Sequence, residues 1–105
     1  MVERTRALGA VPVLLTAPTS HRQGHLPEAL VPRYIRSIDD LVPLHEAYVD
    51  VVRDVARSTE TPLCDLHQAF QMIPEKALDA SFRDDGIHLT PAGDERLAAF
   101  LDACL

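Results

Sequence analysis

The sequence predicts an α/β fold in which parallel strands are covered by helices. Two short apolar runs, residues 11–15 and 61–66, have the length and composition of strands that are buried on both faces. Segments typical of helices precede, separate and follow these runs. Strands that alternate with helices build parallel sheets, so the order helix, strand, helix, strand, helix indicates this class.

Glycine and proline mark the ends of the first elements. Residues 3–8 are good helix formers and end at Gly9, a residue that enters the left-handed conformation cheaply at a helix end. The apolar run at 11–15 then predicts the first strand. Residues 16–32 contain three prolines, a glycine and polar residues without a clear period, so they predict a long loop.

The second helix is predicted within residues 33–58, where apolar residues recur at spacings of three and four. Pro43 suits the first turn of such a helix. We expect one stripe to face the core, made of Leu44, Ala47, Tyr48, Val51, Val52 and Val55. The run at 61–66 predicts the second strand. Asp65, near its end, is expected to have a structural role in orienting the next turn.

The last helix is predicted from Thr90 as N-cap and Pro91 at the first helical position. Its buried stripe would contain Leu97, Phe100, Leu101 and Cys104. Residues 67–80 show no pattern that predicts an element. Cys64 and Cys104 both fall in apolar stretches, where we expect free thiols that behave as small hydrophobic side chains, with no inference about a redox compartment.

Length and charge restrict the function classes. The 105 residues suit one folding unit, and acidic residues spread along a chain of net charge -6 argue against nucleic acid as a partner. No stretch approaches the roughly 20 apolar residues of a membrane span. Two strands alone would leave apolar edges unpaired. We therefore expect residues 1–105 to be the C-terminal part of a larger α/β domain, with self-association through an exposed strand edge.

Asp85 and His88 are the candidate catalytic residues. Loops at the carboxyl ends of parallel strands gather catalytic groups, and this pair lies on a loop that leads into the last helix. Three residues apart in a turn closed by Gly86, an aspartate can accept a hydrogen bond from one imidazole nitrogen. The other nitrogen is then free to act as general base and general acid towards a hydroxyl nucleophile.

The string Asp-Gly-Ile-His-Leu-Thr-Pro-Ala-Gly at residues 85–93 resembles the last motif of the SGNH hydrolases, also called the GDSL esterase/lipase family. Residues 9–18 and 62–66 resemble two late strands of that family. The resemblance implies a three-layer α/β/α, flavodoxin-like, parallel-sheet domain. It also implies that Asp85 and His88 belong to a serine triad that cleaves small acyl or acetyl esters, with no metal or organic cofactor.

The chain departs from this family in its other motifs. It contains neither the Gly-Asp-Ser motif of the nucleophile nor the blocks that supply the oxyanion donors. The resemblance therefore assigns to this chain only the Asp and His part of a triad, and ester hydrolysis to a complete form. The alternative is a non-catalytic α/β piece that associates with another chain.

Four further residues were weighed as site residues. Asp84 is the rival carboxylate, four residues before His88, and is expected to be solvated. Ser20 follows the first strand and is the one hydroxyl to consider as a substitute nucleophile, but no glycine-flanked elbow surrounds it. His21 and His25 are four residues apart, yet no third metal ligand is evident, so loop histidines are expected.

Overall fold

The computed structural model describes residues 1–27 and 35–105, and it is a mixed helical structure with a small parallel sheet. Its elements are α1 (Val2–Ala7), β1 (Leu14–Leu15), η2 (Ile38–Asp40), α2 (Leu41–Ser58), β2 (Leu63–Cys64), α3 (Leu66–Gln71), α4 (Glu75–Ser81) and α5 (Pro91–Cys104). The predicted order of helices and strands is confirmed. The short helices α3 and α4 occupy most of residues 67–80, where no element was predicted.

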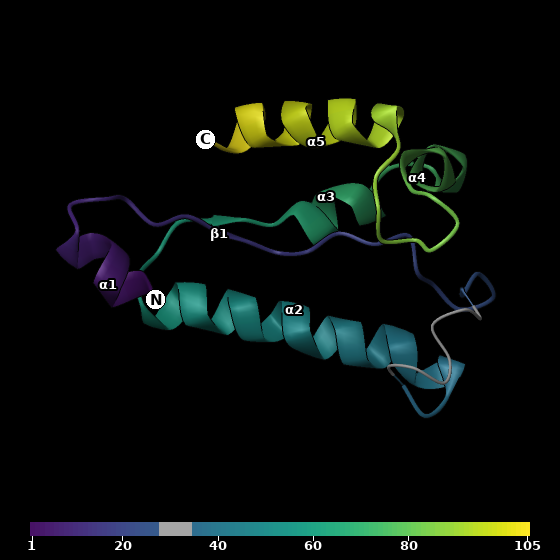
Figure 1. The fold of residues 1–105 in the computed structure, drawn as a ribbon, viewed down its shortest axis with the longest axis horizontal. Coiled ribbons are helices and arrows are strands. Elements are labelled where there is room, and N and C mark those ends of the chain that lie inside the picture. Colours follow the sequence, from purple (N-terminus) through teal and green to yellow (C-terminus); the bar gives the residue numbers. More distant parts are fainter. Residues whose placement is uncertain (28–34) are drawn as a thin grey trace.

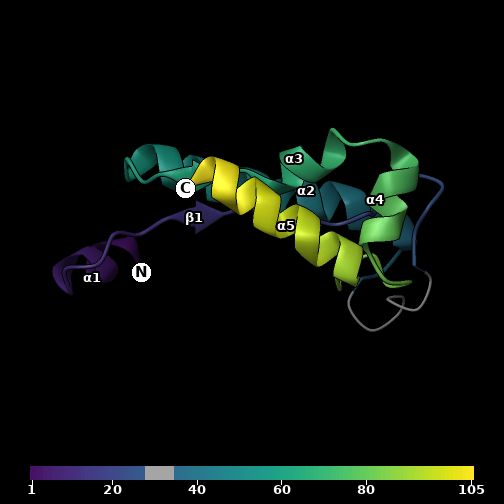
Figure 2. The same ribbon diagram turned by 90° about the horizontal axis from the view of Figure 1, so that it is seen from above.

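The two strands pair in parallel, with Leu14 opposite Leu63 and Leu15 opposite Cys64. Helices α2 and α5 lie on opposite sides of this pair in Figure 1, and α5 crosses above it in Figure 2. The prediction of a first strand over 11–15, buried on both faces, is wrong. Val11 is 81% exposed and Leu15 46% exposed. Among the described residues, each strand pairs only with the other, and the pairing spans two residues of each strand.

Helix α2 begins at Leu41, inside the predicted range, and Pro43 lies in its first turn as expected. Residues 28–34, which carry parts of the predicted loop and helix, lie outside the described residues. The predicted buried face is wrong, since Tyr48 is 67% exposed. Val49 and Ala56 are buried instead. The helix is apolar on two sides, and the side that carries Val49 and Ala56 is the buried one.

The hydrophobic core lies where α3, α4 and α5 meet. Phe70, Leu78 and Phe82 are buried there, and the half-buried Leu97 and Phe100 of α5 pack against them. Phe70 meets both other phenylalanines edge to face, with ring centroids 5.3 Å from Phe82 and 5.1 Å from Phe100. This confirms the predicted inward orientation of Phe100.

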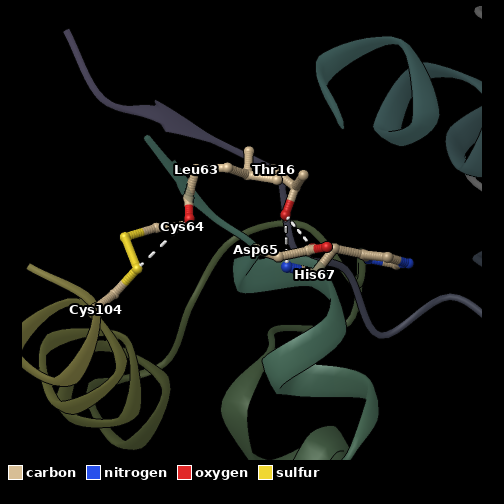
Figure 3. The surroundings of a disulfide bond; sticks show 6 residues. All are labelled: Thr16, Leu63, Cys64, Asp65, His67 and Cys104. Carbon is tan, nitrogen blue, oxygen red and sulfur yellow. Dashed lines mark hydrogen bonds between the residues drawn. A yellow bond between two sulfur atoms is a disulfide. The ribbon is translucent and has the colours of Figure 1, made fainter. Parts of the chain in front are cut away.

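The expectation of two free thiols is wrong, because Cys64 and Cys104 form a disulfide (Figure 3). Cys64 is buried in β2, and Cys104 is the last residue of α5. Their Cα atoms lie 5.9 Å apart across 40 residues of sequence. The two cysteines come together because α5 crosses β2. The sequence around either cysteine does not predict this crossing. The enclosed segment contains the whole Asp85 to His88 turn.

The start of α5 confirms the predicted cap. The Thr90 side chain accepts a hydrogen bond from the Gly93 amide at 3.2 Å, and Pro91 is the first helical residue. Gly93 is required at this position, since a Cβ atom there would lie 2.0 Å from the carbonyl oxygen of Ser81. The motif's last glycine therefore lets α5 approach the end of α4.

Candidate functional site

Asp85 and His88 lie in a turn that backbone hydrogen bonds close from both sides. The Arg83 amide donates to the His88 carbonyl at 2.8 Å, and the Gly86 amide donates to the Arg83 carbonyl at 2.8 Å. Phe82 and Leu89 form an antiparallel bridge just outside the turn. Phe82 belongs to the core and anchors the base of the turn. Within the turn, Gly86 is buried, whereas Ile87 and His88 are exposed.

The Asp85 carboxylate holds the histidine through three hydrogen bonds. Oδ2 lies 2.5 Å from Nδ1 of His88, and Oδ1 accepts from the amides of Ile87 at 2.8 Å and His88 at 2.9 Å. The hydrogen bond from the His88 side chain, followed by those from the two amides, lowers the pKa of Asp85 well below its usual range. Asp85 is therefore ionised at neutral pH, and Nδ1 of His88 carries the proton between them.

This arrangement leaves the other nitrogen of His88 available for chemistry. The His88 side chain is 74% exposed, against 34% for Asp85. With the proton on Nδ1, Nε2 presents a lone pair that can accept a proton from a hydroxyl group. Asp84, the rival carboxylate, is exposed and makes no hydrogen bond to His88. The geometry thus pairs His88 with Asp85, as the motif predicts.

Two residues after β1 hold the turn from behind, and the sequence did not indicate this role. Nε2 of His21 lies 2.7 Å from the Asp85 carbonyl oxygen, and the Ser20 amide donates to the Gly86 carbonyl at 3.0 Å. Gly86 has a φ of +70°, and a Cβ atom there would lie 2.5 Å from the His21 ring. Glycine is therefore needed both for the backbone conformation and for the contact with His21.

The same contacts bear on the alternative site residues. Ser20 is 3% exposed and lines a cavity of about 440 Å³ with His21, His25, Asp79 and other residues. His88 does not line this cavity, and no hydrogen bond joins Ser20 to the His88 side chain among the described residues. His21 contacts Asp85, whereas His25 lies 3.5 Å from Asp79. In residues 1–27 and 35–105, no group of three or more histidine, cysteine or acidic side chains is placed to hold a metal ion.

A second, largely apolar hollow of about 480 Å³ adjoins the Asp85 and His88 pair. Leu44 and Tyr48 of α2 form one wall, and Ile87 of the turn forms another. The hollow places exposed apolar side chains beside His88, whose side chain is 74% exposed. No sequence period links residues 44 and 87, so this hollow was not predictable from the pattern of either segment.

Asp65 has the structural role expected of it, within a larger network of which Figure 3 draws Thr16, Asp65 and His67. It caps α3 by accepting from the Gln68 amide at 3.2 Å, and it accepts from Thr16 Oγ1 at 2.7 Å. Arg53 of α2 donates to both carboxylate oxygens, at 2.7 and 3.2 Å. Thr16 in turn accepts from the His67 amide at 2.9 Å. The network ties α2 to the carboxyl ends of both strands.

Two further histidines, for which the sequence offered no partners, join α2 to α3 and to the loop after β1. His67 is buried and bonds Glu46 through Nε2 at 2.7 Å. His45 lies edge to face with His67 and bonds the Ala17 carbonyl at 2.9 Å. Burial, together with the nearby His67, lowers the pKa of His45, which is therefore neutral at pH 7.

Comparisons with known protein families, with curated proteins and with solved structures each found no match. Among the helices in the described part of the chain, none has the length and apolar character needed to cross a membrane.

Proposed function

We propose that this chain carries the acid–base half of a serine ester hydrolase of the SGNH type. The observation that supports this most directly is the 2.5 Å contact between Asp85 Oδ2 and His88 Nδ1, in a turn where the His88 side chain is 74% exposed. In the complete enzyme, Nε2 takes the proton of the serine hydroxyl as it attacks the ester carbonyl, and returns it to the leaving alcohol. Asp85 holds the tautomer and stabilises the imidazolium.

The proposal includes the finer fold. Residues 1–105 form the C-terminal part of a three-layer α/β/α, flavodoxin-like domain, whose other strands extend the β1 and β2 pair. The position of α2 and α5 on opposite sides of that pair supports this arrangement. A serine and oxyanion donors come from polypeptide other than these 105 residues, because the chain has no Gly-Asp-Ser sequence.

The test has two steps. The chain alone should hydrolyse a chromogenic acetyl ester no faster than free imidazole, because no oxyanion donors stabilise a tetrahedral intermediate. The coding sequence upstream of Met1 should then be read for an in-frame Gly-Asp-Ser segment, and the extended protein assayed. There, His88→Ala should reduce turnover by about 10⁶-fold and Asp85→Asn by on the order of 10⁴-fold.

Asp84→Asn is the matched control and should retain most activity. The Asp84 carboxylate is exposed, so water screens its electrostatic effect on His88. If Asp84→Asn were damaging and Asp85→Asn silent, the residue assignment would be wrong. Equal tolerance of all three substitutions would refute the hydrolase proposal. Turnover by the chain alone that Ser20→Ala abolishes would show that Ser20 is the nucleophile.

A second candidate is a non-catalytic piece that associates with another chain. It is favoured by the apolar stripe on α2, where Leu44, Tyr48, Val51 and Val55 are 39% to 67% exposed. Sizing of the chain across a concentration range would test it. Association that persists in His88→Ala, together with an inactive extended protein, would favour this candidate.

A further inference from the structure

We propose that the disulfide between Cys64 and Cys104 is a thiol-exchange site, at which a low-molecular-weight thiol becomes attached to Cys104. This inference goes beyond the proposed function and does not depend on it. It assigns chemistry to two cysteines that the Asp85 and His88 pair does not use.

The first argument is that the two cysteines differ in their exposure to solvent. Cys64 lies in β2 and is only 1% exposed, whereas Cys104 is exposed in the last turn of α5 (Figure 3). The rate of thiol–disulfide exchange depends on which sulfur atom an incoming thiolate can reach. A thiolate that arrives from solvent should therefore attack Sγ of Cys104 in preference to Sγ of Cys64.

The second argument is a hollow of about 280 Å³ that has both cysteines in its wall. Ala69 of α3 and Ala103 of α5 also line it, and their small side chains leave space beside the disulfide. Its volume is close to the lower limit of roughly 300 Å³ for small-molecule sites. The hollow therefore suits the sulfur-bearing end of a small thiol.

The third argument is that the last turn of α5 can separate from β2 while the rest of the helix stays in place. The start of α5 is held by the Thr90 amide, which donates to the Ser81 carbonyl at 3.0 Å. The middle of the helix packs against the core through Leu97 and Phe100. Residues 102–104 are exposed, so little packing besides the disulfide fixes this turn.

The exchange needs no reactant besides the small thiol. Its thiolate sulfur bonds to Sγ of Cys104 as the bond between the two cysteine sulfur atoms breaks. The electron pair of that bond leaves on Sγ of Cys64, which then takes a proton from water. The small thiol is thereby oxidised to a mixed disulfide, and Cys64 is reduced to a thiol. Reversal requires Cys64 to attack the mixed disulfide, for which the last turn of α5 must return to β2.

The experiment treats the oxidised chain with reduced glutathione under native conditions, stops the reaction early with acid, and locates the adducts by peptide mass spectrometry. Glutathione should be found on Cys104 in excess over Cys64 by at least about tenfold, because access decides which sulfur is attacked. In urea that unfolds the chain, the two adducts should form in similar amounts. Amide exchange in the native adduct should accelerate in the last turn of α5 and stay unchanged in its first turn.

Ala103→Leu and Ala99→Leu form a matched pair, since Ala103 lines the hollow and Ala99 is exposed on the same helix outside it. Ala103→Leu should slow the native reaction severalfold by filling the hollow, and Ala99→Leu should leave its rate unchanged. The inference would be overturned by equal rates in these two variants, or by equal amounts of the two adducts in the native wild type. Full reduction of the native wild type without a detectable adduct on Cys104 would overturn it as well.

The comparison of the two adducts uses the wild-type chain alone, so it decides the question even if a variant fails to fold. It also involves no ester turnover. An inactive extended protein would therefore refute the hydrolase proposal and leave the result on Cys104 standing.

Discussion

Nε2 of His21 lies 2.7 Å from the carbonyl oxygen of Asp85, across 64 residues of sequence. His21 is buried, and its Nδ1 has no hydrogen-bond partner among the described residues. The simplest assignment places the proton on Nε2, which then donates to the carbonyl. The loop after β1 thus fixes the backbone of the residue that orients His88.

His21→Ala should loosen the Asp85 turn without unfolding the protein. Loss of a buried hydrogen bond costs about 1 to 3 kcal/mol, so exchange of the His88 amide should accelerate by roughly 5-fold to 150-fold. His21→Gln keeps a side-chain donor and should recover part of the protection. His25→Ala, at a half-exposed position beside Asp79, is the control and should leave this amide unchanged. Unaltered exchange in His21→Ala would show that the contact does not stabilise the turn.

Reduction of the Cys64 to Cys104 disulfide should destabilise the protein and release the end of α5. For a loop of 40 residues, the chain-entropy treatment gives a loss of about 4 kcal/mol in the free energy of unfolding. Urea unfolding with and without reductant measures this difference. Cys104→Ser should match the reduced protein and be insensitive to reductant. Equal midpoints for the oxidised and reduced wild type would contradict the prediction.

The sequence predicted those parts of the structure that depend on local chemistry. The cap at Thr90 and Pro91 was found because the capping residues are adjacent to the helix they start. The pairing of Asp85 with His88 was found because both partners lie in one turn. Asp65 was correctly given a structural role, since a carboxylate at a strand end commonly caps the next helix.

The predictions that were wrong concern contacts between segments that are far apart in the sequence. The face of α2 that packs on β1 could not be chosen, because apolar residues lie on two sides of the helix. The disulfide and the His21 contact join segments that are 40 and 64 residues apart. The spacing of residues along the sequence does not predict contacts over such separations. One signal was available for His21. Loops that follow parallel strands share one edge of the sheet, which would have placed residues 16–21 near the Asp85 turn.

Asp65 should make stability depend on pH in acid. Burial raises the pKa of Asp65, but hydrogen bonds from Arg53, Thr16 and Gln68 outweigh it and lower the pKa below the usual value. A group with a lowered folded pKa stabilises the protein above its unfolded pKa of about 3.9, and loses that contribution as pH falls through the folded value.

Asp65→Asn should therefore lower the free energy of unfolding by about 1 to 3 kcal/mol at pH 7. The gap in this free energy between the variant and the wild type should narrow progressively below about pH 4. Urea midpoints measured across this range give the gap directly. Asp54→Asn is the control, because its ion pair with Arg57 is exposed and should contribute little at any pH. A gap that stays constant down to pH 2 would mean that the Asp65 charge is not what stabilises the network.

Gly86→Ala should damage the Asp85 turn more than the same change at another glycine of similar conformation. Gly86 and Gly24 have φ values of +70° and +81°, so alanine at either position is strained by the backbone, at about 1 kcal/mol. A Cβ atom at Gly24 meets nothing within 4 Å, whereas one at Gly86 would lie 2.5 Å from the His21 ring and 2.9 Å from Ser20 Oγ. Gly86→Ala therefore adds an overpacking cost of roughly 1 to 3 kcal/mol, because the buried His21 ring must move.

The two variants separate backbone strain from the His21 contact. Gly24→Ala should lower the free energy of unfolding by about 1 kcal/mol and leave the NMR signals of His88 unchanged. Gly86→Ala should lower it by about 2 to 4 kcal/mol, and it should shift the His88 ring signals, because displacing His21 releases the Asp85 carbonyl. In the double variant Gly86→Ala with His21→Ala, the ring is removed, so the overpacking cost should disappear and the two losses should not add. Additive losses in that cycle would show that Gly86 is required for its backbone conformation alone.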